Sequence, residues 1–300
     1  MEKVSILHLI TAAKNASPFD VNMAYDAGFD KIMPYTNVNL QEVAGLTQDA
    51  IFSRSPSGIK REGIFIGGRN IDLAMDMQAA AKTSMFAPFE ISTFADPSGA
   101  FTTAAAMMAK VEHQLIANHG SGFAGGRVSI FGASGPVGGC AAVIAAFAGA
   151  DVELVAHRGL SDMQLKADAY NTRYNIAITA VDGVSDEAKR LVLSTSEVVI
   201  CTAAAGVRVL DLAQFNQSTT IKVMADVNAV APSGVEGVDA FANGDLIKGT
   251  KIAGIGALAI GQLKYKTQQG LLQQMLASQK AIHLDFNAAF LVARELAPTV

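Results

Sequence analysis

The segment RVSIFGASGPVGG, residues 127–139, decides how the second half of the chain folds. The valine, isoleucine and phenylalanine at its start are typical of a buried strand, and Gly132, Gly135 and Gly138 follow at the spacing G-x-x-G-x-x-G. The apolar residues 137–149 then have the composition of a buried helix. A strand, a glycine turn and a helix in this order form the first unit of a Rossmann-like domain.

The glycine turn has the properties needed to bind the pyrophosphate of a dinucleotide. Gly132 and Gly135 allow the backbone to approach the phosphates, and amide groups at the helix start bind their negative charge together with the helix dipole. Gly138 lets the helix approach the strand, and Ser134 can donate a further hydrogen bond. Because the usual spacing is G-x-G-x-x-G, a tight strand–helix turn without a ligand is the alternative.

The residues after the turn alternate regularly between strand and helix patterns. Strands are expected at 127–132, 151–156, 176–181, 198–202 and 222–226, with helices at 137–149, 161–173 and 185–193. Helices of this length between strands imply parallel pairing through right-handed crossovers. We therefore expect an NAD(P)-binding Rossmann domain, with a doubly wound parallel sheet, over residues 123–267.

The end of the second strand of this domain bears on the choice between NAD and NADP. An acid at that position would bind the ribose 2′-hydroxyl of NAD, but the strand ends in His157-Arg158. Arg158 suits a 2′-phosphate, although a solvated surface arginine is the alternative. Asp162 lies close enough in sequence to keep NAD use open, so we expect both NADP and NAD to serve.

Two later segments of small residues can also approach a cofactor. The segment CTAAAG, residues 201–206, follows a strand, and its small side chains would let the nicotinamide ribose lie against the backbone. The same argument applies to the glycines of GIGALAIG, residues 254–261. Glycines that serve close packing alone are the alternative in both places.

The first half of the chain also reads as α/β. Strands are expected at 4–10, 31–34, 63–67 and 89–94, and helices at 18–26, 43–49, 70–84 and 101–117. The glycine-rich segment 119–126 is the best candidate boundary. We thus expect a two-domain α/β protein with a cleft between its domains: a substrate domain over residues 1–122, completed by C-terminal helices within 268–300, and the Rossmann domain over 123–267.

Composition excludes several classes of function. The net charge of -4 and the absence of a basic run argue against a nucleic-acid partner. Cys140 and Cys201 lie in apolar surroundings, which fits buried thiols in a reducing cytoplasm. No apolar stretch reaches the roughly 18 residues of a membrane span, and residues 4–13 fit an opening strand better than a signal peptide. The histidines are scattered, so we expect no metal, and no flavin either.

A few polar residues stand alone within apolar stretches and are candidates for a second site. They are Asp20 beside Phe19, Asp96, Thr102 and Lys264, with Gly67 at the end of a strand. Each has a structural alternative: Asp20 can cap a helix, Thr102 can start one, and Lys264 can be a surface lysine.

Six blocks of the chain resemble the NAD(P)-dependent methylene-tetrahydromethanopterin dehydrogenases of methylotrophic bacteria. They are FDVNMAYDAGFD (19–30), GIFIGGRN (63–70), FADPSGAFTTAAAM (94–107), FGASGPVG (131–138), ADVNAVAPSGVEGVD (225–239) and GIGALAIGQLKYKT (254–267). They cover nearly the whole chain in the same order. A related NADP-specific branch, which also accepts methylene-tetrahydrofolate, has Gly-Arg-Lys where this chain has His157-Arg158-Gly159. The missing lysine points to the branch that uses both cofactors.

The resemblance implies oxidation of methylene-tetrahydromethanopterin to the methenyl form in formaldehyde oxidation, with hydride passing to NAD(P), in a cytoplasmic homo-oligomer. The motifs that match imply a pterin side of Phe19, Asp20, Gly67, Asp96, Thr102 and Lys264, and a cofactor side of Gly132, Ser134, Gly135, Pro136, Val137, Gly138, His157, Arg158, Ala203 and Asn228. Asp20, Asp96 and Lys264 are the catalytic candidates. An acid could stabilise the cation that develops on the pterin, and Lys264 could hold a pterin carbonyl or carboxylate.

Three other functions remain open at this point. The same reaction on methylene-tetrahydrofolate is the nearest. A shikimate-type dehydrogenase would need a lysine–aspartate pair acting on a hydroxyl proton, and no recognisable motif supplies one. A non-catalytic dinucleotide sensor would keep the turn at 132–138 but would not need the blocks at 19–30, 94–107 and 254–267.

Overall fold

The computed structural model describes residues 4–300, so the first three residues of the expected substrate domain lie outside the described residues. The chain forms two compact α/β units. The first extends to Thr102 and includes Tyr265–Val292, and the second comprises Thr103–Lys264 and Ala293–Val300. The first division falls inside helix α4 (Ala100–His119), earlier than the expected boundary at residue 122. Most of α4 belongs to the second unit, where Lys110 donates to the Asn243 Oδ1 atom at 2.8 Å.

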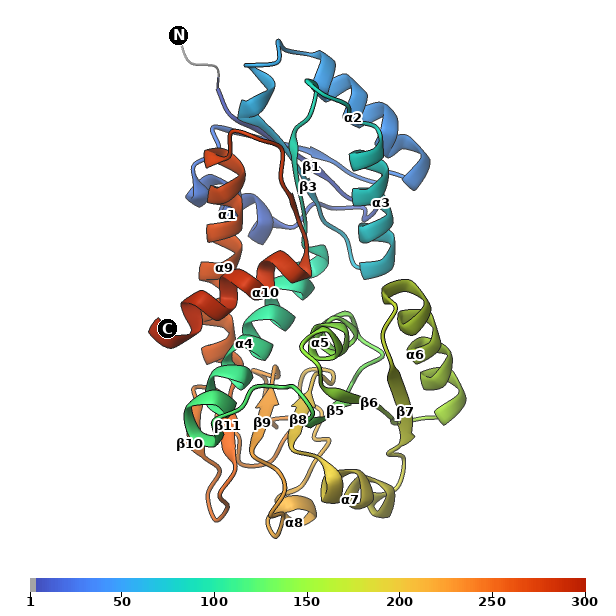
Figure 1. Cartoon of the computed structure of the whole chain (residues 1–300), viewed down its shortest axis with the longest axis vertical. Coiled ribbons are helices and arrows are strands. Elements are labelled where there is room, and N and C mark those ends of the chain that lie inside the picture. The colour runs from blue at the N-terminus through green and yellow to red at the C-terminus, as the bar shows by residue number, and fades with distance from the viewer. Residues whose placement is uncertain (1–3) are drawn as a thin grey trace. The chain divides into compact units, whose positions relative to one another are not determined.

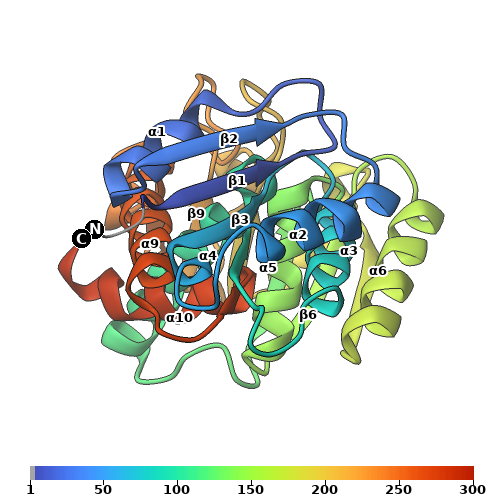
Figure 2. The same ribbon diagram turned by 90° about the horizontal axis from the view of Figure 1, so that it is seen from above.

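The sheet of the first unit is parallel, in the order β12-β4-β3-β1-β2. Its strands are β1 (Ile6–Ile10), β2 (Lys31–Tyr35), β3 (Glu62–Ile66), β4 (Ser92–Ala95) and β12 (His283–Leu284). Figure 1 shows α2 (Val43–Phe52) and α3 (Ile71–Thr83) together on one face and α1 (Pro18–Ala27) on the other, and Figure 2 shows β1 beside β2. The chain order reverses between β1 and β3, and this is where open α/β sheets bind ligands.

Local capping explains where the first helices begin and end. The Asn70 side chain accepts from the amides of Asp72 and Leu73, so Asn70 is the N-cap of α3, close to the expected start at residue 70. Helix α1 begins after Ser17, whose hydroxyl accepts from the amide of Asp20 at 3.4 Å, and ends at Gly28 with φ +107. Ser17 is therefore the N-cap, and the alternative that Asp20 serves as a cap is wrong.

The sheet of the second unit has the order β10-β11-β9-β8-β5-β6-β7. Its strands are β5 (Arg127–Phe131), β6 (Asp151–Ala156), β7 (Ile178–Asp182), β8 (Val198–Cys201), β9 (Val223–Asp226), β10 (Asn243–Leu246) and β11 (Ala253–Ile255). The expected doubly wound sheet is confirmed, and the chain order reverses between β5 and β8. The expected strands all pair in parallel, and β10, which was not among them, adds one antiparallel edge by pairing with β11.

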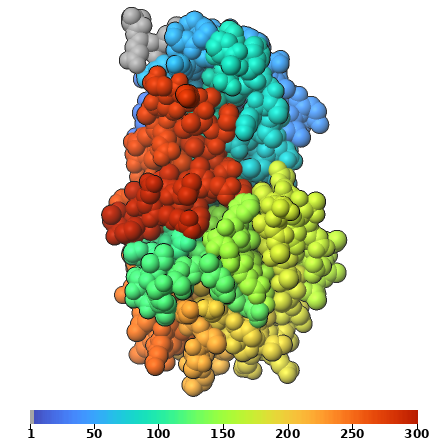
Figure 3. Space-filling view, viewed as in Figure 1, coloured from blue at the N-terminus to red at the C-terminus, as the bar shows by residue number. Residues whose placement is uncertain are grey.

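The helices of the second unit lie on both faces of its sheet. They are α5 (Pro136–Phe147), α6 (Leu160–Tyr174), α7 (Asp186–Thr195) and α8 (Leu212–Phe215). Figure 1 shows α5 and α6 on one face and α7 and α8 on the other, and in the space-filling view of Figure 3 α6 forms part of the surface. This is the arrangement that right-handed crossovers produce on either side of a switch point.

The C-terminal part of the chain differs from expectation. Helix α9 runs from Ala257 to Ala277, so it starts directly after β11 and not near residue 268. The block GIGALAIG is thus a strand end followed by a helix. A side chain at Gly256 would overlap the backbone oxygens of Asp239 and Ala240, so this glycine serves close packing. Helix α10 (Phe286–Leu296) follows as expected.

Among residues 4–300, the structure contains no helix that combines the length and the apolar character needed to cross a membrane.

Candidate functional site

The glycine turn lies between β5 and α5 and leaves backbone amides exposed to a ligand. Gly132 has φ +83, which a residue with a side chain rarely adopts, and the Gly135 amide donates to the Gly132 oxygen at 3.0 Å. Gly135 is the N-cap of α5, and it has no side chain to accept from the first amides of the helix. Those amides and the positive end of the helix dipole are therefore available to an anion.

The turn packs tightly against the segment that follows β8. A Cβ atom at Gly132 would lie 2.6 Å from the Thr202 carbonyl carbon and 2.7 Å from the Ala203 nitrogen. A Cβ atom at Gly138 would lie 2.8 Å from the Ala133 Cα atom. The backbone thus leaves a cradle at the switch point between β5 and β8, and this cradle has no room for side chains at either glycine.

A cavity of about 620 Å³ opens at the carboxyl ends of β5, β6, β7 and β8. Its volume is in the range of ordinary ligand sites. Seven of the expected cofactor residues line it: Gly132, Ser134, Gly135, Pro136, His157, Arg158 and Ala203. Val137, Gly138 and Asn228 are not among its lining residues.

The wall of this cavity is basic. Besides His157 and Arg158, it includes Lys189 and Arg208, and no aspartate or glutamate is among its lining residues. Sequence reasoning missed Lys189 and Arg208, because a lysine in an amphipathic helix and an arginine in a loop usually belong to a solvated surface. No local pattern distinguishes these two cations from others in the chain.

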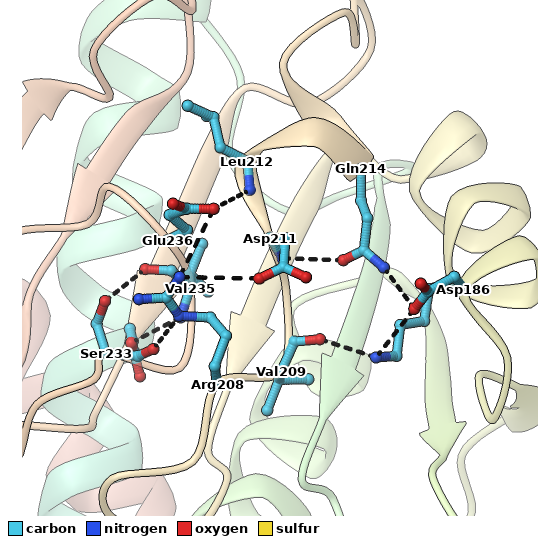
Figure 4. A network of polar contacts seen from close by, with 11 residues as sticks. Asp186, Arg208, Val209, Asp211, Leu212, Gln214, Ser233, Val235 and Glu236 are labelled. Carbon is cyan, nitrogen blue, oxygen red and sulfur yellow. Dashed lines mark hydrogen bonds and ion pairs between the residues drawn. The ribbon is translucent and has the colours of Figure 1, made fainter.

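A network of polar contacts holds Arg208 in place (Figure 4). Its Nε atom donates to the Ser233 oxygen at 2.7 Å, and its Nη1 atom lies 3.6 Å from Glu236 and 3.8 Å from Asp211. Gln214 links this group to Asp186, since it accepts from the Asp211 amide and donates to the Asp186 carboxylate. Two acids thus lie within 3.8 Å of the Arg208 guanidinium.

The Asn228 side chain forms hydrogen bonds with backbone groups near the cavity. Its buried Oδ1 atom accepts from the amides of Gly206 at 3.2 Å and Val230 at 2.9 Å, and its Nδ2 atom donates to the Pro232 oxygen at 3.1 Å. These bonds tie the segment after β8, which lines the cavity, to the loop after β9. Asn228 thus connects two loops at this edge of the sheet, and its contact with the cofactor stays a prediction.

Asp226, the last residue of β9, forms hydrogen bonds with the backbone of the same loop. Its carboxylate is buried and accepts from the amides of Asn228 and Val235, each at 3.0 Å. Burial raises the pKa of Asp226, while these amide donors act in the opposite direction.

Cys201 at the end of β8 is a buried thiol, as expected, and so is Cys140. Burial, followed by the charge of Asp226, raises the pKa of Cys201 from 9.0 to about 12. We predict that iodoacetamide does not modify Cys201 in the native protein at about pH 8, because the thiolate is the reactive form. Mass spectrometry of alkylated peptides measures this.

The unfolded chain supplies the control, since Cys201 should react once guanidinium exposes it. Rapid alkylation of the native protein would contradict the assignment. Raising the pH from 9.0 towards 12 should also favour unfolding, because the unfolded thiol loses its proton first.

Polar groups of the first unit gather at the carboxyl edge of its sheet. Gly67 follows β3, Asp96 follows β4, and Thr11, which sequence reasoning missed, follows β1. Thr11 is buried, and a Cβ atom at Gly67 would lie 3.8 Å from its Cβ atom. Ser98 donates to the Gly68 oxygen at 2.9 Å. These residues surround the switch point between β1 and β3, where a ligand of this unit is expected.

Asp96 and Thr102 form the start of α4. The Asp96 carboxylate accepts from the amides of Phe101 at 2.9 Å and Thr102 at 3.1 Å, and from the Thr102 hydroxyl at 2.6 Å. Both residues are fully buried. Thr102 lies in the first turn of α4, which begins at Ala100, so the structural alternative for Thr102 fits, and Asp96 satisfies the first amides of the same helix.

Asp20, Phe19 and Lys264 have different surroundings. The Asp20 side chain is buried and accepts from the Gln268 Nε2 atom at 3.0 Å, whereas Phe19 is 44% exposed. Lys264 lies on α9 one turn before Gln268, in the part of the helix that belongs to the second unit. Within residues 4–300, no group of three or more histidine, cysteine, aspartate or glutamate side chains is placed to hold a metal ion.

The chain is similar to known proteins over nearly its full length. Residues 18–98 match the family model described as methylene-tetrahydromethanopterin dehydrogenase, N-terminal. The NAD(P)-dependent methylenetetrahydromethanopterin dehydrogenase of Methylorubrum extorquens is 44% identical, over 98% of this chain and 99% of the relative. The Bifunctional protein MdtA of the same organism is 31% identical, over 94% of this chain and 95% of the relative.

Two solved structures share the fold at low identity. Shikimate 5-dehydrogenase from Listeria monocytogenes has a TM-score of 0.53 at 12% identity and covers 93% of both chains. Quinate dehydrogenase from Corynebacterium glutamicum has a TM-score of 0.53 at 13% identity, over 96% of this chain and 98% of that one. At this level of identity the likeness concerns the two-unit α/β architecture alone.

Proposed function

Because this chain belongs to the family of NAD(P)-dependent methylene-tetrahydromethanopterin dehydrogenases, we propose that it oxidises methylene-tetrahydromethanopterin to methenyl-tetrahydromethanopterin with NAD(P) as hydride acceptor. The observation that carries the proposal is the identity of 44% over 98% of the chain. The chain is an oxidoreductase of this family, and it uses NAD or NADP.

The second unit fits the cofactor. The cradle at Gly132 and Gly138 has no room for a Cβ atom, and the basic cavity beside it suits a dinucleotide carrying two or three phosphates. When bound, the nicotinamide ring supplies the carbon that accepts the hydride. The turn and the amides of α5 hold the phosphates, and Asn228 keeps the segment after β8 in place.

The reaction makes modest demands on acid–base groups. The substrate carbon that loses hydride is flanked by two nitrogens, so the product is an amidinium cation stabilised by resonance. No proton has to be removed, and the protein must mainly position the reacting carbon and exclude water. Asp20, held by Gln268, supplies a negative charge to stabilise the cation, and Lys264 holds a polar group of the pterin.

Asp96 is a weaker catalytic candidate than Asp20. Both of its oxygens accept hydrogen bonds from the first turn of α4. We propose that it maintains the carboxyl edge of the first sheet, beside Gly67, and does not act on the pterin directly.

An assay of the purified full-length protein tests the proposal. We expect absorbance of reduced nicotinamide to appear with methylene-tetrahydromethanopterin and either NAD or NADP, because the family uses both. The same assay is repeated with methylene-tetrahydrofolate as the substrate. Faster turnover of the folate would reassign the substrate, and cofactor binding without turnover of either pterin would favour a dinucleotide sensor.

We further propose a place in formaldehyde oxidation, in the cytoplasm, as a homo-oligomer. Cys140 and Cys201 are both buried thiols, which suits a reducing compartment. Large apolar side chains such as Phe241, 72% exposed, and Leu246, 65% exposed, offer surface to bury between subunits. Light scattering of the purified protein measures the oligomeric state, and a monomeric mass would refute that part.

A further inference from the structure

Lys189 is a second cation in the cavity that contains Arg158. Arg158 follows β6, whose last residue Ala156 pairs with Asp182 of β7, so the two strands end level. Lys189 lies in the helix after β7, and both cations line the same cavity. The sheet thus brings two residues 31 positions apart in the sequence to one wall.

We propose that Lys189 is a specificity-determining residue, which binds the 2′-phosphate of NADP together with Arg158. The proposal rests on the function proposed above, since it assumes that this cavity holds the cofactor. A phosphate monoester carries close to two negative charges near pH 7, so one arginine leaves part of its charge unbalanced.

The charges around the cavity favour this assignment. No acid is among the lining residues, so none is placed there to accept from the 2′-hydroxyl of NAD. The nearest acid to Lys189 is Asp186, whose carboxylate lies 3.8 Å away and is 69% exposed, so solvent screens the pair strongly. Lys189 thus keeps most of its attraction for an anionic ligand.

The geometry of Lys189 suits a phosphate. Its Nζ atom donates to the Val209 oxygen at 2.9 Å, and its side chain is 21% exposed. An ammonium group has three N–H donors, so this bond orients the group and leaves donors for a ligand. Val209 also lines the cavity, so the bond holds Lys189 at its wall.

Arg208 is the contrasting case. Its guanidinium also reaches the cavity, but Glu236 and Asp211 lie within 3.8 Å of its Nη1 atom and the Ser233 oxygen accepts from its Nε atom (Figure 4). Arg208 thus has two acids beside it, where Lys189 has one, and Glu236 is less exposed than Asp186. Arg208 should therefore contribute equally to the affinity for adenine nucleotides with and without a 2′-phosphate.

Calorimetric titration with 2′,5′-ADP and 5′-AMP separates these roles, because the two probes differ only in the 2′-phosphate. The variant Lys189→Met removes the charge and keeps much of the side-chain length. We expect the preference for 2′,5′-ADP, taken as the ratio of the two Kd values, to fall about 10-fold or more, since a hydrogen bond between charged groups is lost. Arg158→Met should lower the ratio in the same way.

Three further variants make the test specific. Arg208→Met should weaken both probes alike, and Lys248→Met, an exposed lysine outside the cavity, should keep the wild-type ratio. Gly159 has extended backbone and open space around its Cβ position, so Gly159→Lys can place a cation beside Arg158. Added to Lys189→Met, it should restore part of the preference.

If Lys189→Met weakens both probes equally, or if it changes the affinity for neither probe, the ratio of the two Kd values stays at its wild-type value and the proposal is overturned. Neither result touches the dehydrogenase reaction, because no pterin is present. If the wild-type protein bound neither probe, the cavity would not be the cofactor site, and the assignment of Lys189 would fall with it. In active protein, the ratio of kcat/KM for NADP and NAD should follow the binding ratio.

Discussion

Alanine at Gly132 is expected to weaken the binding of NAD and NADP by about 100-fold or more, the cost of losing two hydrogen bonds to a charged group. At φ +83 the new side chain is strained, and its Cβ atom would lie 2.6 Å from the Thr202 carbonyl carbon and 2.7 Å from the Ala203 nitrogen. Backbone atoms cannot rotate away as a side chain can, so the turn has to move. Its movement displaces the amides that we propose to hold the pyrophosphate.

Gly149→Ala is the matched control for Gly132→Ala. Gly149 has φ +86, so alanine is equally strained there, but its Cβ atom would meet Ala124 only at the ordinary distance of 3.5 Å. Gly149 does not line the cavity. The left-handed backbone should cost both variants roughly 1 to 2 kcal/mol of stability, Gly132→Ala should lose more because of the overlap, and only Gly132→Ala should lose the cofactor. Fluorescence titration, with thermal unfolding to establish folding, measures both. A folded Gly132→Ala protein with wild-type affinity would refute the role of the turn.

Substitution at Asp20 and at Lys264 is expected to reduce kcat/KM for the pterin by about 100-fold each, the usual effect of removing one group that stabilises charge in a transition state. Asp20→Asn keeps the shape of the buried side chain that accepts from Gln268 and removes its charge. Lys264→Ala removes the group proposed to hold the pterin. Because neither lies in the dinucleotide cavity, the Kd for the cofactor should stay within about twofold.

Controls for this pair come from the same helices. Asp26 is an exposed acid on α1, and Lys266 is an exposed lysine on α9. Asp26→Asn and Lys266→Ala should therefore retain kcat/KM. Steady-state kinetics with varied pterin at saturating cofactor measures all four variants. If Asp20→Asn and Lys264→Ala both left kcat/KM unchanged, the assignment of the pterin side to these residues would be wrong.

Much of the fold follows from residues close together in the sequence. The cap at Asn70, the helix end at Gly28 and the turn at Gly132 each rest on a local rule about hydrogen bonding or positive φ. The strands around β5 are apolar because parallel strands are covered on both faces, and this pattern is visible without any partner strand. Helix α9 begins at Ala257, before the expected residue 268, and the glycine before it, Gly256, is required by packing against Asp239 and Ala240.

Some residues of the candidate sites could likewise be predicted from contiguous sequence, and others could not. The residues of the turn were predictable, since strand, glycines and helix are contiguous. Lys189, Arg208 and Thr11 were not, because each reaches its site from an element whose own pattern shows only a helix, a loop or a strand end. Asp96 was singled out as an isolated polar residue and Asn228 by resemblance, but their hydrogen bonds to the start of α4 and to Gly206 appear only in the structure.

The sequence by itself therefore determined that the second half of this protein is a doubly wound sheet with a glycine turn at residues 132–138, for which we propose phosphate binding. Such a turn depends on contiguous residues, so its physics is local. Only the tertiary structure decided that Arg158 and Lys189 line one cavity, with no acid among its lining residues. That arrangement depends on β6 and β7 being neighbours, and the pairing of strands is determined by burial over the whole sheet and not by any single segment.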